Sequence, residues 1–169
     1  MFSPRLSPNG TMEAMNALRT ILTPLVVALL YLSPSIQAAN LHGKVVGISD
    51  GDTITILTKD KQNIKIRLVE IDAPEKDQPW GQKSKQALSD LIFSLNVTVD
   101  STGSDRYGRT LGTVFLSNIN INKHMVENGN AWAYTQYVRD QNYFELQKSA
   151  KSKQLGLWSL SKDQTIAPW

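Results

Sequence analysis

The sequence predicts an α+β fold that is mainly a β barrel, with five strands of the OB type and three helices. Three observations lead to this prediction. Five short runs are rich in β-branched residues and are separated by turn signals. A segment with a helical apolar period lies between the third and fourth runs, and two further helical segments follow the fifth. Barrels of this type often bind oligonucleotides.

The first three runs are expected to form consecutive strands. Residues 43–49 (GKVVGIS) and 53–58 (TITILT) flank Asp-Gly-Asp, and Asp-Gly between such runs is a strong hairpin signal. In the third run, residues 63–72, the apolar parity changes between Leu68 and Val69. This change predicts a bulge or a barrel strand that is buried on both faces.

The remaining elements alternate in type. The pattern predicts a helix, two strands and two more helices, in the order 81–94, 96–101, 109–116, 121–129 and 141–154. The turn SDRYG leads into the fifth strand. Gly129 is expected to close the helix before it, and Gly156 to end the last helix.

The first 38 residues have the pattern of an export signal. An apolar run from Leu18 to Leu32 is followed by small residues, and cleavage is expected after Ala38. The alternative is an uncleaved membrane anchor, although the run is short for a membrane span and contains Pro24.

We therefore expect residues 1–38 to be a signal peptide and residues 39–169 to form one domain. A true start at Met15 would make residues 1–14 an extension. The protein is expected to be exported, periplasmic or secreted, and to have no stable membrane association once the signal is removed.

The composition narrows the kinds of metal site and catalytic group that the protein can contain. Residues 1–38 carry two arginines and one glutamate, so removing them lowers the net charge from +3 to +2, too small to indicate a polyanionic partner by itself. The chain has no cysteine, which excludes disulfides, thiolate metal sites and cysteine nucleophiles. His42 and His124 lie far apart without acidic or serine partners at useful spacing, which argues against zinc sites and serine triads. Oxygen ligands are then the metal chemistry available.

Two acidic motifs could supply such oxygens. Taken alone, Asp50-Gly51-Asp52 is a tight turn, and Asp72-Ala73-Pro74-Glu75 is a strand end with surface acids. The functional interpretation makes Asp52, Asp72 and the carbonyl of Ala73 ligands of a hard cation such as calcium. Glu75 would stay unligated and accept a proton from the attacking water.

Two arginines could bind the phosphate. Surface arginines are common, but Arg67 lies between Ile66 and Leu68 in an apolar strand, where a charge is seldom buried without a partner. Together with Arg109 it could present two planar forks of donors to one phosphate and stabilise the charge that builds there during displacement.

Aromatic residues lie beside basic ones in Arg106-Tyr107, and WAYTQY contains Tyr134 and Tyr137. Aromatic side chains are more often part of the core. A tyrosine at a barrel rim could instead stack on a base or hydrogen-bond a phosphate.

The motifs DGDT, RLVEIDAPE and DRYGR, in this order, resemble the staphylococcal nuclease (thermonuclease) family. The similarity extends from Gly43 to Trp158 and includes GQKSKQAL and the closing GLW. The resemblance implies a five-stranded OB barrel with three helices. It also implies calcium-dependent hydrolysis of DNA and RNA, with cleavage of the P–O5′ bond and 3′-phosphate products.

The resemblance also implies a role for each candidate residue. Asp52 and Asp72 match the carboxylate ligands, and Ala73 matches a backbone-carbonyl ligand, at a position where the best-known member has threonine. Asp50 matches an acid just outside the ligands, and Glu75 matches the proposed general base.

On the substrate side, the family's two catalytic arginines match Arg67 and Arg109, and its contacts to substrate match Arg106, Tyr107, Tyr134 and Tyr137. The loop after Glu75 is shorter than in the best-known member. The sequence thus predicts an exported, calcium-dependent, sugar-nonspecific nuclease that acts as a monomer on DNA and RNA. The alternative is a non-catalytic OB-fold module that binds nucleic acid or peptide, although none of the catalytic residues is missing.

Overall fold

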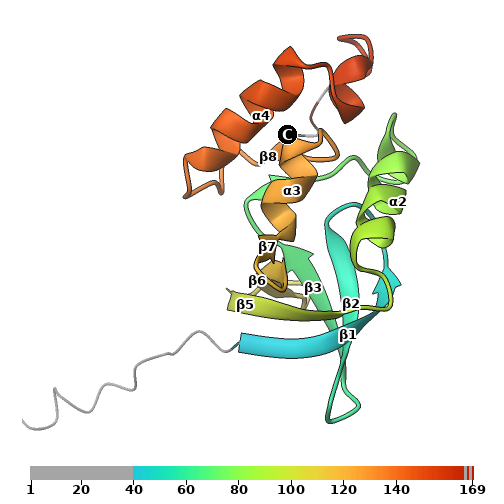
Figure 1. The fold of residues 1–169 in the computed structure, drawn as a ribbon, viewed down its shortest axis with the longest axis vertical. Helices are drawn as coiled ribbons and strands as arrows, with labels where there is room; N and C mark the ends of the chain where they lie inside the picture. The colour runs from blue at the N-terminus through green and yellow to red at the C-terminus, as the bar shows by residue number, and fades with distance from the viewer. Residues whose placement is uncertain (1–39, 166, 168) are drawn as a thin grey trace, which may run out of the picture. The chain divides into compact units, whose positions relative to one another are not determined.

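The computed structural model describes residues 40–165, 167 and 169, so the predicted signal peptide lies outside it. Figure 1 shows the described elements, with the helices gathered toward one end of the barrel. In chain order they are β1 (Asn40–Ile48), β2 (Thr53–Thr58), β3 (Asn63–Leu68), β4 (Ile71–Asp72), α2 (Gly81–Ile92), β5 (Asn96–Ser104), β6 (Thr110–Leu116), β7 (Ile119–Asn120), α3 (Ile121–Glu127), β8 (Trp132–Ala133), α4 (Asn142–Ser152) and the 3-10 helix η1 (Gly156–Ser159). None of the described helices is long and apolar enough to cross a membrane.

The strands form a closed mixed barrel. Antiparallel pairing gives the order β3-β2-β1-β5-β6, with the short β7 beside β6. Strands β3 and β6 then pair in parallel, from Ile66 opposite Thr110 to Leu68 opposite Gly112, and this closes the barrel. The predicted five-stranded OB barrel with three helices is confirmed.

The β-branched positions of the strands make the core. Six β-branched side chains of the barrel have 0% of their surface exposed: Val45, Ile54, Ile56, Ile66, Val99 and Val114. Burying each contributes on the order of 1.5–3 kcal/mol. The barrel is therefore a rigid frame for the residues at its strand ends.

The run of residues 63–72 does not form one strand, so the expected bulge or doubly buried strand is wrong. Val69 and Glu70 form a turn, with Glu70 at φ 65°, and β4 then pairs with β8. The carbonyl of Val69 accepts a hydrogen bond from Asn122 Nδ2 at 2.9 Å instead of continuing the β-ladder. The buried Asn122 side chain is thus the partner that lets the chain turn here.

The prediction for the end of the last helix was also wrong, whereas that for Gly129 is confirmed. Helix α4 ends at Ser152, and the left-handed residue that follows it is Gln154 (φ 53°), not Gly156. Gly129 follows the C-cap of α3 with φ 65°. Gly156 begins η1, and a Cβ there would lie 2.1 Å from the carbonyl oxygen of Gly129.

The predicted hairpin between β1 and β2 forms, but Gly51 is needed there for close packing and not for a left-handed turn. The connection spans residues 49–52, and Ser49 N–H donates to the carbonyl of Thr53 at 2.8 Å. Gly51 has no left-handed φ, but a Cβ there would lie 1.8 Å from Ser84 Oγ and 2.7 Å from Ala73 Cβ. Glycine is required because α2 and the Asp72-Ala73 segment approach its backbone closely.

Candidate active site

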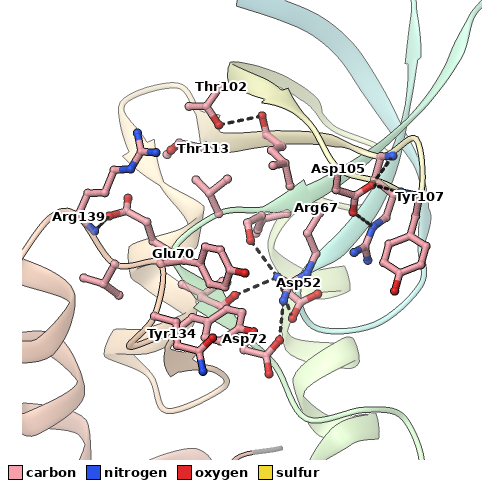
Figure 2. Close-up of a pocket in the computed structure, with 18 of the residues that line it drawn as sticks. Asp52, Arg67, Glu70, Asp72, Thr102, Asp105, Tyr107, Thr113, Tyr134 and Arg139 are labelled. Atoms are coloured by element: carbon pink, nitrogen blue, oxygen red, sulfur yellow. Dashed lines mark hydrogen bonds and ion pairs between the residues drawn. The ribbon is translucent and has the colours of Figure 1, made fainter. Parts of the chain in front are cut away.

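One pocket of about 840 Å³ brings together residues from distant parts of the sequence. Figure 2 shows its centre, where side chains of β3, β4 and the β1–β2 connection meet. The pocket is lined by ten of the eleven predicted site residues: Asp50, Asp52, Arg67, Asp72, Glu75, Arg106, Tyr107, Arg109, Tyr134 and Tyr137. Ala73 is not among its lining residues and is 4% exposed.

Arg67 lies at the centre of the pocket and joins the two predicted carboxylate ligands. Pairing of Thr53 with Arg67 places the end of β3 beside Asp52. The guanidinium lies 3.1 Å from Asp52 Oδ2 and donates to Asp72 Oδ1. It also donates at 2.9 Å to the carbonyls of Leu68 and Ile71.

These contacts leave Arg67 donors for a ligand. The hydrogen bonds to Leu68, Ile71 and Asp72 use three of its five N–H groups. Two N–H groups of Arg67 thus have no hydrogen-bond partner among the described residues, and phosphate binding by Arg67 stays a prediction.

Asp52 is held at the base of the pocket by hydrogen bonds to both oxygens. Oδ2 accepts from the backbone N–H of Ala73 at 2.6 Å, and Oδ1 accepts from Thr53 Oγ1 at 3.0 Å. The pKa of the Asp52 carboxyl is raised to about 8, mainly by burial, with the charges of Asp50 and Asp72 adding to the rise and the charge of Arg67 opposing it. The pKa of Asp72 is raised as well, mainly by burial and against Arg67, with Glu75 and Asp50 adding to the rise.

The acids of the pocket fit a hard cation. The charges of Asp50 and Asp72 add to the raised pKa of Asp52, and those of Glu75 and Asp50 add to that of Asp72, so a cation placed among these acids would relieve their mutual repulsion. Within residues 40–165 and the two described residues after them, no three His, Asp or Glu side chains are grouped to hold an ion. A cation here would therefore depend on Asp52 and Asp72 together with backbone or water oxygens, as calcium accepts.

Glu75 has a fixed backbone and an exposed side chain. Its N–H donates to Gln78 Oε1 at 2.7 Å, and its carbonyl accepts from the N–H of Gln78 at 2.8 Å. Gly81 passes so close that a Cβ there would lie 1.8 Å from the same carbonyl oxygen. No described side chain hydrogen-bonds to the Glu75 carboxylate, and Glu75 lines the pocket.

Arg109 is positioned by Asp105, a residue that the sequence analysis missed. Asp105 Oδ1 accepts from the N–H groups of Tyr107 and Arg109, both at 2.9 Å, and Oδ2 accepts from Arg109 Nε at 2.7 Å. Desolvation would raise the pKa of Asp105, but these hydrogen bonds and the charge of Arg109 hold it below its usual value. No described residue hydrogen-bonds to the terminal nitrogens of Arg109. An aspartate opening the turn before Arg109 was the available signal.

Tyr107 lies at the edge of the pocket, close to both Arg106 and Arg109. Its side chain is 68% exposed, and Arg106 donates to its hydroxyl at 2.7 Å. The guanidinium carbons of Arg106 and Arg109 lie 4.9 and 5.5 Å from its ring centroid. The predicted grouping of these three residues is thus present.

Tyr134 and Tyr137 lie on the segment between β8 and α4. Their ring centroids are 4.7 Å apart, and Trp169 lies 4.7 Å from Tyr134 on centroids. Glu70, also missed by the sequence analysis, holds this segment, because its carbonyl accepts from Tyr134 N–H at 2.9 Å. Its carboxylate accepts from backbone N–H groups a few residues later.

Comparison with known proteins agrees with this geometry. The family model described as "Staphylococcal nuclease homologue" matches residues 65–160. A protein of Haemophilus influenzae named "Uncharacterized endonuclease" is 49% identical over 151 residues, covering 89% of this chain and 84% of the relative. A Shigella flexneri protein named "Micrococcal nuclease" is 42% identical over 156 residues, covering 85% of this chain and 88% of the relative. The chain belongs to the staphylococcal nuclease family.

Proposed function

We propose that this nuclease is an exported, calcium-dependent enzyme that hydrolyses phosphodiester bonds in both DNA and RNA, cleaving the P–O5′ bond and leaving 3′-phosphates. The observation that carries the proposal is the meeting of Arg67, Arg109 and Glu75 with two acids in one pocket. Relatives that cover most of the chain are named as endonucleases or as a micrococcal nuclease, which supports hydrolysis of nucleic acid.

Each side chain has one part of the reaction. Arg67 and Arg109 bind the scissile phosphate and stabilise the charge that develops on its oxygens. The exposed carboxylate of Glu75 takes a proton from the attacking water. Calcium, held by Asp52, Asp72 and the carbonyl of Ala73, would supply further positive charge at the phosphate. Arg106 and Tyr107 hold a neighbouring phosphate, and Tyr134 and Tyr137 lie beside the nucleotides.

The proposed site selects for the phosphodiester rather than for the base. Its charged donors and acids suit a phosphate and a cation, and phosphate contacts carry no sequence information. The absence of base and sugar preference follows from this construction of the site.

Metal removal tests the proposal. Hydrolysis of single-stranded DNA and RNA by residues 39–169 is expected to stop when EGTA removes calcium and to return when calcium is added back. The products should carry 3′-phosphates, which a phosphatase sensitive to the 3′ end detects. Tight binding without cleavage under any divalent metal would favour the alternative, a non-catalytic binding module.

Export is proposed from residues 1–38 and has a separate test. N-terminal sequencing of the protein recovered from cells and culture medium is expected to begin at Ala39, because the small residues up to Ala38 fit signal cleavage. A retained apolar run from Leu18 to Leu32 would indicate a membrane tether instead.

A further inference from the structure

The pocket continues past the catalytic centre to a basic side chain that has no part in the proposed reaction. Arg139 lines it, together with Glu70 and Val138. In Figure 2, Arg139 and Tyr107 lie on opposite sides of the centre that Arg67, Asp52 and Asp72 form. The pocket therefore has basic residues on both sides of its acidic centre.

The backbone of Arg139 is fixed independently of its side chain. Glu70 Oε1 accepts hydrogen bonds from the N–H of Arg139 at 2.7 Å and of Asp140 at 2.8 Å. Glu70 lies in the turn between β3 and β4, two residues after Leu68. This contact sets the position of Arg139 relative to the catalytic strand.

The guanidinium of Arg139 is available for a ligand. None of the ion pairs found in the described part of the chain includes Arg139. The neighbouring carboxylate, Asp140, is paired with Lys123 at 2.7 Å. The side chain is exposed at the pocket, so a bound anion would not have to displace a protein partner.

We propose that Arg139 binds a backbone phosphate of the substrate strand on the side of the scissile bond opposite Tyr107. This inference rests on the proposed function and extends it from one phosphodiester to a strand of several nucleotides. A polyanionic strand that crosses the acidic centre is held better by cations on both sides than by cations on one. Because the contact is to phosphate, it strengthens binding to any base sequence.

The contact should depend on the length of the substrate. A dinucleotide has one phosphodiester, which the catalytic arginines hold, and offers no further phosphate to Arg139. A longer strand does. Arg139 is thus a substrate-binding residue whose effect appears in KM for long substrates.

Three variants of the full chain test this. Arg139→Ala removes the side chain but keeps the N–H that Glu70 binds, and Arg139→Lys keeps a positive charge. Lys148→Ala makes the same charge change at an exposed residue of α4 that does not line the pocket. For each, hydrolysis of a long single-stranded oligonucleotide and of a dinucleotide is measured in calcium, and oligonucleotide binding is measured in EGTA at several salt concentrations.

Arg139→Ala is expected to raise KM for the oligonucleotide about fivefold at unchanged kcat, with no change for the dinucleotide. The slope of log binding constant against log salt is negative and should become less steep by about 0.7, the value for one phosphate contact on a single strand. Arg139→Lys should keep KM for the oligonucleotide and the salt slope close to those of the unmodified protein. Lys148→Ala should change neither quantity. Oligonucleotide hydrolysis and salt slope equal to those of the unmodified protein, or equal losses in Lys148→Ala, would overturn the role of Arg139. An unmodified protein that binds oligonucleotides but cleaves none would instead contradict the proposed function.

Discussion

Replacing Arg67 with alanine is expected to lower kcat for single-stranded DNA by about 10³–10⁵-fold, the range for an arginine that stabilises charge on a phosphoryl group. The variant loses a donor fork at the phosphate and the group that orients both Asp52 and Asp72. Single-turnover hydrolysis at saturating calcium measures the loss without interference from product release.

Stability should change as well, because Arg67 supplies positive charge to two carboxyls in a largely buried site. Its removal is expected to lower the free energy of unfolding by about 3 kcal/mol, at the lower end of values for a broken buried pair. The lower end applies because Asp72 is partly exposed and Asp52 can take up a proton. Urea unfolding without metal measures this, and calcium should stabilise the variant more than the unmodified protein.

Two further substitutions separate the effect of the positive charge of Arg67 from that of its planar guanidinium. Arg67→Lys keeps the charge but not the planar fork, so it should recover most of the stability and little of the rate. Lys65→Ala removes a charge from an exposed position of the same strand and should change neither. Near-normal turnover by Arg67→Ala would show that phosphate is not stabilised from this position.

The barrel could be predicted from the sequence because the residue pattern of each strand indicates which of its faces is buried. Alternating β-branched residues such as those of TITILT need one apolar face, and the structure buries it. Closure of the barrel, by contrast, depends on parallel pairing of β3 with β6, which no local pattern encodes. That pairing sets Arg67 opposite Leu111 and so brings the strand that follows Arg109 to the pocket.

The candidate site could be predicted as a set of residue types but not as a set of contacts. Asp52, Arg67 and Asp72 are each visible as a charge next to an apolar strand, whereas the ion pairs among them depend on strand register. Asp105 and Glu70 were missed because most of their partners are backbone N–H groups, which every sequence contains; the one side-chain partner is Arg109, which Asp105 binds. Gly51 was assigned to a turn because its real constraint, Ser84 of α2, lies far along the chain.

Glu75→Gln is expected to lower kcat about 10²–10⁴-fold, the usual contribution of general acid–base catalysis, with little change in KM. Glutamine has nearly the same shape but cannot accept the proton from water. The backbone hydrogen bonds with Gln78 do not involve the replaced carboxylate, and no described side chain holds it, so the free energy of unfolding should stay within about 0.5 kcal/mol.

A matched control distinguishes loss of the base from loss of a negative charge. Asp77→Asn removes an acid from an exposed position of the same loop that does not line the pocket, and it should keep full turnover. Calcium binding by Glu75→Gln, followed by calorimetry, should remain close to normal, because Glu75 is not one of the proposed ligands. Loss of calcium binding together with loss of rate would make Glu75 a ligand, and full turnover would mean that another group takes the proton.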